Sequence, residues 1–300
     1  MVHADMSWLK LQRRLAPYFF IAPFFLGYAV FWGYPVVQGF WTSLHSEQFG
    51  PGGRHWVGLH NYRALLSDDR YLHALRNTFT YALGSIFIIV PASLAIALCL
   101  NVEWLRFRGL FRFAFLLPNV VSAAVIAIMF VLVLDANYGV LNAYLVKPLG
   151  FAPINWLGSP KWSMPSLILL GLWRYAGINS LYFLVGLQNI PKDLHDAAAL
   201  DGAGRWRTFR DVTWPQLRPV TMFVVVIAII GSFKLFAEPQ ILFSGPGPDD
   251  AALTVMTYLY LTAFQSVRFA YAAAIGYSLV IIIAVLAVIQ LRFFGAFRED

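Results

Sequence analysis

Three charged side chains interrupt otherwise apolar stretches of the sequence. These are the residues with which the chain could bind a solute. Arg174 lies in an apolar segment at about 163–187, and Lys234 and Glu238 lie four residues apart in another at about 219–240. Placing a charged side chain in the hydrocarbon core costs about 2.5–3.5 kcal/mol, so a charged residue within a span is first interpreted as functional. Lys234 and Glu238 could pair along one helix face, with Arg174 bound to backbone carbonyls or extended toward the membrane surface. The alternative is that all three line a solute pathway.

Two uncharged polar residues share the segment with Arg174. Asn179 and Tyr182 lie three positions apart and so fall on one helix face, whereas Arg174 is displaced from Asn179 by about 140°. An amide and a phenol can orient hydroxyl groups without selecting for charge. We therefore expect Asn179 and Tyr182 to contribute to a solute pathway, ahead of Arg174.

The sequence contains no motif for catalysis or metal binding. It has no Gly-x4-Gly-Lys-Ser/Thr phosphate loop, so ATP would have to be hydrolysed by a partner. The six histidines lie mostly in loops without a His-x-x-x-His pair, and no serine or cysteine sits in a nucleophile motif. Cys99, the one cysteine, can form no internal disulfide. We assign no catalytic residue, no metal and no bound cofactor to this chain.

The composition is that of a membrane protein. Hydrophobic residues make up 59% of the 300 residues and charged ones only 12%, which is unusual for a soluble domain. The net charge of +7 does not indicate nucleic acid, because 13 of the 22 Lys and Arg fall in segments expected in the cytoplasm. These segments hold three (1–16), three (101–112), five (189–218) and two (292–300).

Six apolar blocks are each long enough to cross a bilayer. They lie at about 17–43, 77–100, 113–134, 163–187, 219–240 and 270–291. Pro23 and Pro35 predict a kink in the first, and a further helix is expected at 251–264, at or above the outer surface. The lysine and arginine bias puts both termini in the cytoplasm. The sequence thus predicts an all-α integral membrane protein with six transmembrane helices. A single domain at 17–292 lies between a cytoplasmic segment (1–16) and a cytoplasmic tail (293–300).

The polar run at 189–218 stands out from the apolar second half of the chain. Pro191 favours a helix start, and Gly202 and Gly204 predict a break between two short helices. Leu194, Ala197 and Ala198 fall at i, i+3 and i+4 and form a narrow apolar stripe. Small side chains on such a stripe permit close approach of another backbone, so this surface is typical of a docking site.

The spacing in this run resembles the EAA loop of permease subunits in binding-protein-dependent ABC importers. The motif falls on Asp196, Ala197, Ala198, Gly202, Val212 and Pro215. Asp196, Val212 and Trp214 stand where the family usually has Glu, Ile and Leu. In that family the loop is the coupling helix, which docks in a groove of the cytoplasmic ATPase. The resemblance implies that the coupling residues here are Leu194, Asp196, Ala197, Ala198, Asp201, Gly202 and Pro215.

Further fragments extend the resemblance over most of the chain. Val57-Gly-Leu-His-Asn-Tyr62, Leu75-Arg-Asn-Thr78, Tyr138-Gly-Val-Leu-Asn142 and Ile154-Asn-Trp-Leu-Gly158 look like segments of permeases related to the maltose importer. The resemblance implies the type I permease fold of ABC importers, in the inner membrane of a bacterium or archaeon. The implied partners are a second permease, two ATPase subunits that carry ATP and Mg, and an external solute-binding protein.

The resemblance implies a sugar or oligosaccharide as the solute. Arg174 and Lys234 leave open an anionic solute such as glycerol 3-phosphate. An autonomous secondary carrier is the alternative from another class, but a carrier would be expected to show internal repeats and ion-coupling residues. Only one predicted span holds an acid, Glu238, and the polar run at 189–218 has no second copy.

Overall fold

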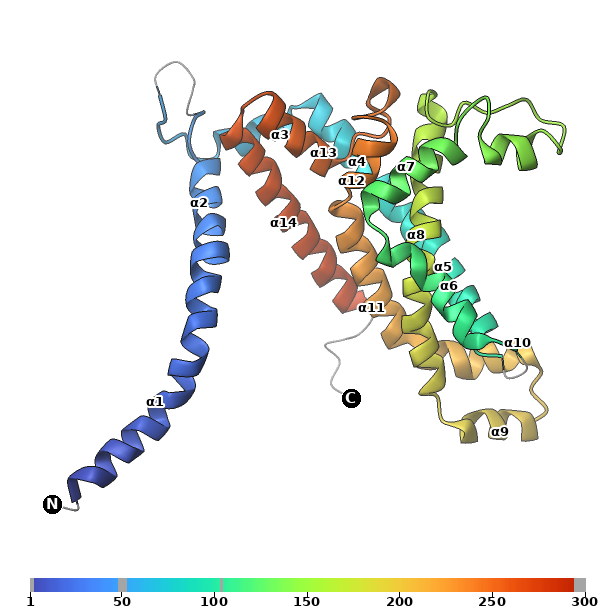
Figure 1. The fold of residues 1–300 in the computed structure, drawn as a ribbon, viewed down its shortest axis with the longest axis horizontal. Coiled ribbons are helices and arrows are strands. Elements are labelled where there is room, and N and C mark those ends of the chain that lie inside the picture. The colour runs from blue at the N-terminus through green and yellow to red at the C-terminus, as the bar shows by residue number, and fades with distance from the viewer. Residues whose placement is uncertain (1–2, 48–52, 103–104, 294–300) are drawn as a thin grey trace.

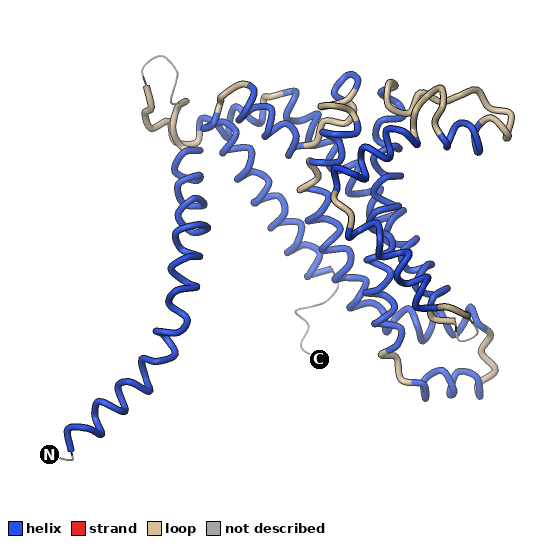
Figure 2. Tube along the Cα trace, viewed as in Figure 1, coloured by secondary structure: helices blue, strands red, loops and turns tan. Residues whose placement is uncertain are grey.

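The computed structural model describes residues 3–47, 53–102 and 105–293. Residues 294–300 of the predicted tail and residues 48–52 lie outside the described part. Figure 2 shows helices joined by loops, with no strand in the described part of the chain. The described chain is therefore all-α, as predicted.

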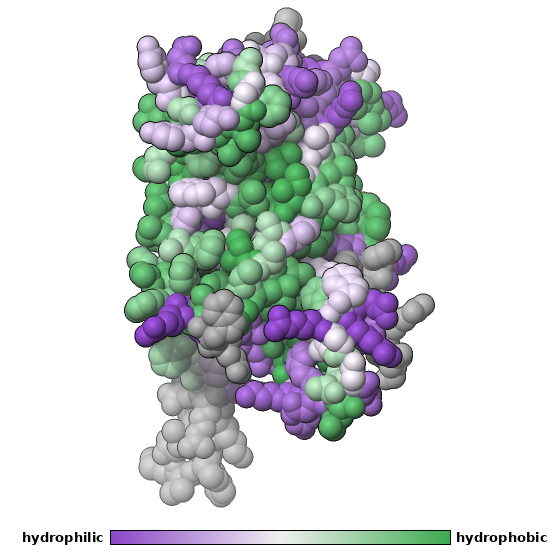
Figure 3. Space-filling model, turned by 90° about the vertical axis from the view of Figure 1, so that its right-hand side faces the viewer, coloured by the Kyte–Doolittle hydropathy of each residue, from purple (hydrophilic) through white to green (hydrophobic). Residues whose placement is uncertain are grey.

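Five helical rods are long and apolar enough to cross a membrane. They are Arg14–Ser43, Asp69–Leu100, Pro160–Gln188, Arg205–Phe233 and Phe269–Arg292. Figure 3 shows hydrophobic residues in a broad band across the middle of one face, with hydrophilic residues gathered toward both ends. This distribution fits a bilayer, whose hydrocarbon core takes about 20 apolar residues of a helix to cross.

Several rods join two or three helical segments. In chain order the elements are α1 (His3–Tyr28), η1 (Ala29–Gly33), α2 (Tyr34–Ser43), α3 (His60–Leu66), α4 (Asp69–Gly84), η2 (Ser85–Ile89), α5 (Val90–Leu100), α6 (Arg108–Val120), α7 (Ala123–Val133), η3 (Asn142–Val146), α8 (Pro160–Gln188), α9 (Lys192–Leu200), α10 (Arg205–Thr208), η4 (Phe209–Thr213), α11 (Trp214–Phe233), α12 (Ala237–Leu242), η5 (Pro248–Asp250), α13 (Val255–Tyr260), η6 (Leu261–Gln265) and α14 (Phe269–Phe293). All η elements are π-helical except η5, which is a 3-10 turn.

Three π-helical turns accommodate prolines within the rods. η1, η2 and η4 each end two residues before a proline, namely Pro35, Pro91 and Pro215. In an α-helix a proline lacks its N–H and its ring clashes with the carbonyl four residues earlier. The wider turn uses bonds five residues apart, such as Trp214 N–H to the Phe209 carbonyl. The rods therefore continue past these prolines.

The predicted third span is bent and not straight. α6 and α7 meet at an angle of 100°, with Val121 and Ser122 in extended conformation between them. Ser122 caps α7 by accepting a hydrogen bond from the Val125 N–H at 3.3 Å. Pro118 lies in the last turn of α6. The pair is therefore one broken span or a re-entrant segment.

The predicted fifth span also has different limits. Its helix begins at Arg205 and ends at Phe233, and the chain then breaks before α12. The polar part of this rod was predicted to be a separate short helix; instead α10 continues through η4 into α11. Gly231 faces open space, so it serves no close helix contact.

The first rod stands apart from the bundle. Figure 1 shows α1 and α2 as one long curved rod, in which α2 lies beside α14 and contacts α3 through Ser43 and Tyr62, 2.7 Å apart. The most apolar part of Arg14–Ser43 buries none of its residues within the chain. The remaining rods pack together around α8, where Gly177 lets the backbone of α6 approach closely at Phe115.

Candidate coupling loop and translocation path

The predicted coupling loop forms a helix at one end of the molecule. α9 lies between the end of α8 and the start of the rod Arg205–Phe233 (Figure 1). The beginning of α1, the connection from α5 to α6 and the end of α14 lie toward this same end. The described parts of the four lysine- and arginine-rich segments therefore approach one side, which we call the coupling end. None of the residues of α9 is buried.

Gly202 ends α9 in the way its position predicts. Its φ is +71°, in the left-handed region that favours glycine. The Gly202 N–H donates to the Ala199 carbonyl at 3.1 Å, and the Ala203 N–H to the Ala198 carbonyl at 2.9 Å. These two bonds make a Schellman motif, which reverses the chain immediately after the helix. The position has open space around it, so the constraint is conformational.

The surface of α9 offers apolar groups without a partner in this chain. Leu200 is 89% exposed and Leu194 is 38% exposed. The predicted stripe of Leu194, Ala197 and Ala198 borders an open groove of about 310 Å³ between α9 and the α10–η4 segment. Asp201 also borders this groove, Asp196 is exposed, and Pro215 lies in the first turn of α11. Leu194, Ala197, Ala198 and Asp201 thus share one groove, while the contact of any of these residues with an ATPase stays a prediction.

An ion pair lies in the middle of the bundle. Arg174 Nη1 is 2.9 Å from Glu238 Oε1, and the Tyr175 hydroxyl donates to the same oxygen at 2.7 Å. The Arg174 and Glu238 side chains are only 14% and 7% exposed. The predicted Lys234–Glu238 pair is wrong, because α11 ends at Phe233 and the two residues no longer share a helix. Lys234 is exposed and makes no ion pair within 4.0 Å among the described residues.

Asn179 lines a small cavity beside this pair. The cavity has a volume of about 110 Å³ and lies between the rod Asp69–Leu100, α8 and α11. Its lining residues are Tyr81, Ser85, Tyr175, Asn179, Ile227, Ala228, Gly231 and Ser232. At about 30 Å³ for each water, the space would hold a few water molecules or one small polar group. Hydroxyl and amide groups on several walls suit hydrogen bonding to hydroxyls.

Tyr182 does not reach this cavity. Its ring packs edge-on against Phe223 of α11, with centroids 5.2 Å apart, and borders a separate hollow toward the coupling end. Asn179 and Tyr182 thus both approach α11, as their shared helix face predicts, but line different spaces. Sequence reasoning missed Tyr81 and Ser85, although their spacing of four residues puts them on one face of the second rod.

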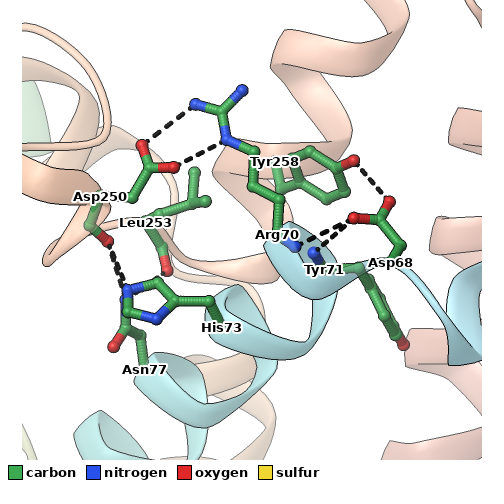
Figure 4. A network of polar contacts seen from close by, with 8 residues as sticks. All are labelled: Asp68, Arg70, Tyr71, His73, Asn77, Asp250, Leu253 and Tyr258. Carbon is green, nitrogen blue, oxygen red and sulfur yellow. Dashed lines mark hydrogen bonds and ion pairs between the residues drawn. The ribbon is translucent and has the colours of Figure 1, made fainter.

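The opposite end, which we call the outer end, carries a polar network (Figure 4). One face of α4 presents Arg70, His73, Asn77 and Thr78, spaced i, i+3, i+7 and i+8. Arg70 holds the Asp250 carboxylate with two hydrogen bonds, of 2.7 and 3.0 Å. The Asp250 carbonyl accepts from Asn77 at 2.9 Å, and His73 Nε2 lies 3.2 Å from it. Thr78 accepts the Val255 N–H at 3.0 Å.

Asp68 joins three helices within the same network. Its Oδ1 caps α4 by accepting the Arg70 and Tyr71 N–H groups, and its Oδ2 accepts the hydroxyls of Tyr258 and Tyr271 at 2.7 Å each. Burial by itself would raise the pKa of Asp68, but these four hydrogen bonds outweigh it and the pKa is lowered. Burial and the bond to Asp68 raise the pKa of Tyr258 to about 12.

Three of the sequence fragments that resemble the permease family each contain an asparagine that hydrogen-bonds the backbone of another segment. Asn61 donates to the Ser43 and His45 carbonyls at 2.8 and 2.9 Å, and Asn77 donates to two carbonyls of the 250–253 segment. Asn142 is fully buried and bonds the Ile154 carbonyl and N–H at 2.8 and 3.1 Å. The fragments ending at Asn142 and beginning at Ile154 therefore meet in space. Each asparagine satisfies backbone groups of a loop that no helix or strand would satisfy.

The relatives of this chain are components of solute importers. Residues 89–298 match the family described as binding-protein-dependent transport system inner membrane component. The chain is 39% identical to the arabinooligosaccharides transport system permease protein AraP of Bacillus subtilis, over 96% of this chain and 91% of that one. It is 34% identical to the lactose transport system permease protein LacF of Rhizobium radiobacter, over 81% of each. It is 29% identical to the trehalose/maltose transport system permease protein MalF of Thermococcus litoralis, over 98% of each.

Solved structures share the fold. A chain of a bacterial ABC transporter involved in the import of the acidic polysaccharide alginate has a TM-score of 0.83 at 23% identity, over 98% of this chain and all of that one. A chain of the alginate transporter in complex with an alginate pentasaccharide-bound periplasmic protein has a TM-score of 0.79 at 25% identity, over 96% and 95%. The predicted importer permease fold is confirmed. With more than half of its length matched, this chain belongs to the inner membrane components of binding-protein-dependent transport systems, as a permease subunit.

Proposed function

We propose that this chain forms half of the translocation path of an oligosaccharide importer, with α9 docked on a separate ATPase. The remaining partners would be a second permease and an external solute-binding protein, and ATP and Mg would bind to two ATPase subunits. The coupling end would face the cytoplasm, together with both chain termini. The observation that supports this proposal most directly is that α9, which connects two long rods, is exposed and has no buried residue.

The charge distribution along the path supports a neutral solute. The positive charge of Arg174 is offset by Glu238 at 2.9 Å, so the centre of the bundle presents no net charge from this pair. Asn179 and its neighbouring hydroxyls in the cavity offer hydrogen bonds without charge selection. Arabinooligosaccharides, lactose and trehalose/maltose, named for the relatives, are neutral carbohydrates of this kind.

An anionic solute is the second candidate, and Lys234 is the observation that favours it. Lys234 is exposed at the break after α11, without an ion-pair partner in the described chain. A fold neighbour belongs to an importer of an acidic polysaccharide. Uptake by a Lys234→Met variant distinguishes the two candidates, because a neutral solute should not depend on this charge. A loss of about 10-fold or more in uptake would favour the anionic solute.

The coupling role is tested by co-purification with the ATPase subunit. Ala198→Trp fills the groove beside α9, so recovery of a subunit with a phosphate loop should fall about 10-fold or more while membrane insertion persists. Ala143→Trp is the control of equal size, because Ala143 is also half-buried but belongs to η3, in the segment between α7 and α8 at the outer end. Normal recovery and normal transport with Ala198→Trp would show that α9 does not dock as proposed.

The path residues are tested by uptake at limiting solute. Asn179→Ala and Tyr182→Phe should each reduce uptake by roughly 5- to 150-fold, corresponding to about 1–3 kcal/mol for one lost polar contact. Assembly and basal ATPase activity should be retained. If both variants take up solute at the parental rate, these residues do not line the path.

A further inference from the structure

The Arg174–Glu238 pair occupies a central position along α8. Fourteen residues separate Arg174 from Pro160 at one end of α8, and fourteen separate it from Gln188 at the other. At 1.5 Å per residue, the pair lies about 21 Å from the end that leads into α9. The rod Arg205–Phe233, which leaves α9 on its other side, is an unbroken helix up to the break that precedes Glu238. Both helices that flank the coupling loop thus extend to this pair.

Glu238 belongs to a segment that can move independently of α11. The break at 234–236 separates α11 from α12, and α12 packs against α7, which itself follows the 100° bend. Only the Glu238 carboxylate makes side-chain hydrogen bonds from α12 to α8, through Arg174 and Tyr175, among the described residues. Breaks of this kind allow neighbouring segments to rotate as units.

The hydrogen bonding of the pair is incomplete. Arg174 Nε is buried without a hydrogen-bond partner, and of the guanidinium donors only Nη1 hydrogen-bonds a side chain in the described structure. Both bonds to Glu238 end on Oε1, while Oε2 accepts none from the described residues. A buried ion pair with a purely structural role needs its remaining donors and acceptors satisfied to offset desolvation. The unused donor and acceptor atoms of Arg174 and Glu238 favour an ion pair whose two side chains change their hydrogen-bonding partners.

The pair also adjoins the cavity of the proposed path. Tyr175 donates to Glu238 and lines the same cavity as Asn179. A shift of α12 away from α8 would release the hydroxyl of Tyr175, a residue of the cavity wall. The released groups, an arginine and a carboxylate, could then hydrogen-bond water or solute hydroxyls.

We propose that the Arg174–Glu238 pair is a gate, closed in this structure, that separates in each transport cycle when the coupling end moves. This inference rests on the proposed transport function. In the closed state the pair holds α12 against α8 beside the cavity. In the open state its charges are solvated in the path, which makes repeated opening possible within a membrane.

Reversible cross-linking tests whether the pair must separate. In the complete importer, with Cys99→Ser, the double variant Arg174→Cys with Glu238→Cys removes both charges together and leaves neither unpaired. A short thiol-cleavable bifunctional reagent is expected to reduce solute uptake by about 10-fold or more, and reductant should restore it. Two matched controls carry one cysteine each and no unpaired charge: Arg174→Cys with Glu238→Gln, and Arg174→Met with Glu238→Cys. Both should be insensitive to the reagent.

The outcomes separate the gate from the proposed function. Undiminished uptake in the cross-linked double variant would overturn the gate while leaving the importer function intact. Absence of uptake and of solute-stimulated ATPase activity in the parental complex would instead contradict the proposed function.

A second measurement needs no cross-link and covers the case in which the cysteine variant does not assemble. The neutral double variant Arg174→Met with Glu238→Gln weakens the closed state, so basal ATPase activity without binding protein should rise about 5-fold or more. Thermal stability should change little, because both charges are lost together. A basal activity equal to the parental one in the assembled variant would also overturn the gate.

Discussion

The two ends of this permease differ in how far the chain satisfies its own groups. At the outer end, Asp68 accepts four hydrogen bonds and connects α4 to α13 and α14, while Arg70 and Asn77 hold the Asp250 segment. At the coupling end, α9 buries no residue and Leu200 is 89% exposed.

Because of this difference, the outer end contributes to the free energy of folding and the coupling end to the free energy of binding a partner. Polar contacts at the outer end contribute to the stability of the chain itself. Apolar side chains at the coupling end have free energy to gain only when a partner covers them. Substitutions at the outer end should therefore affect unfolding, and substitutions in α9 should affect assembly and transport.

The largest effect is expected from Gly202→Val. A β-branched residue at φ +71° costs about 1–3 kcal/mol, so the Schellman turn should rearrange and uptake should fall about 100-fold at unchanged membrane abundance. Gly204→Ala is the matched control, since Gly204 has φ −71° and open space around it. Equal uptake by the two variants would show that the turn at Gly202 has no role in coupling.

Asp68→Asn should have the largest effect on stability. Loss of charge-assisted hydrogen bonds should reduce the free energy of unfolding by about 2 kcal/mol, measured by thermal unfolding in detergent. Because the folded pKa of Asp68 is lowered, its stabilisation is present above the unfolded pKa of about 3.9 and is lost as pH falls through the folded value. The parental protein should lose this contribution in acid, and Asp68→Asn should not.

The neighbouring Asp69→Asn controls for charge and position. Asp69 is exposed in the first turn of α4 and takes part in none of the hydrogen bonds given above for the network. Its replacement should cost less than about 1 kcal/mol. Equal losses for the two variants would mean that the Asp68 network contributes nothing specific.

Leu200→Ser should affect binding without affecting folding. Removing an exposed leucine from α9 should weaken binding of the ATPase subunit about 10-fold while the unfolding temperature of the isolated chain stays the same. Leu66→Ser is the control, because Leu66 is 75% exposed at the outer end. A decrease in unfolding temperature with unchanged binding would reverse the roles assigned to the two ends.

The smallest effect is expected for the Arg70–Asp250 pair. Its side chains are 48% and 29% exposed, so a double-mutant cycle with alanine should give a coupling of about 0.5–1 kcal/mol. The coupling should decrease in high salt, because exposed charges are screened. A coupling of about 3 kcal/mol, insensitive to salt, would show that this pair is a buried element of the outer end.

The sequence predicted those features that depend on local pattern. Apolar length located the five long apolar helices, and the spacing from Asp196 to Pro215 located α9 and its left-handed Gly202. These features depend on residues close together in the chain. For Gly231 the sequence left open a close helix contact or a break in the fifth span, and local pattern could not decide between the two.

Missing this break produced the one wrong pairing. Given a continuous helix, Lys234 and Glu238 had to be neighbours, whereas the true partner of Glu238 lies 64 residues away in α8. The outer network was missed for a similar reason. Arg70, His73 and Asn77 have helical spacing, but their partners at Asp250 lie about 170 to 180 residues away. Such pairs become visible only when the helices are placed together.

The isolated first rod has a consequence for how this protein is made. The apolar part of Arg14–Ser43 buries none of its residues within the chain, so later segments contribute little to its stability during synthesis. As this segment leaves the ribosome, lipid alone must be sufficient for its insertion, and about 20 apolar residues meet that requirement. The membrane insertion machinery can therefore release this helix before the later spans have been inserted. The nascent chain is then anchored while the more polar spans, including the one with Arg174, wait for their partners.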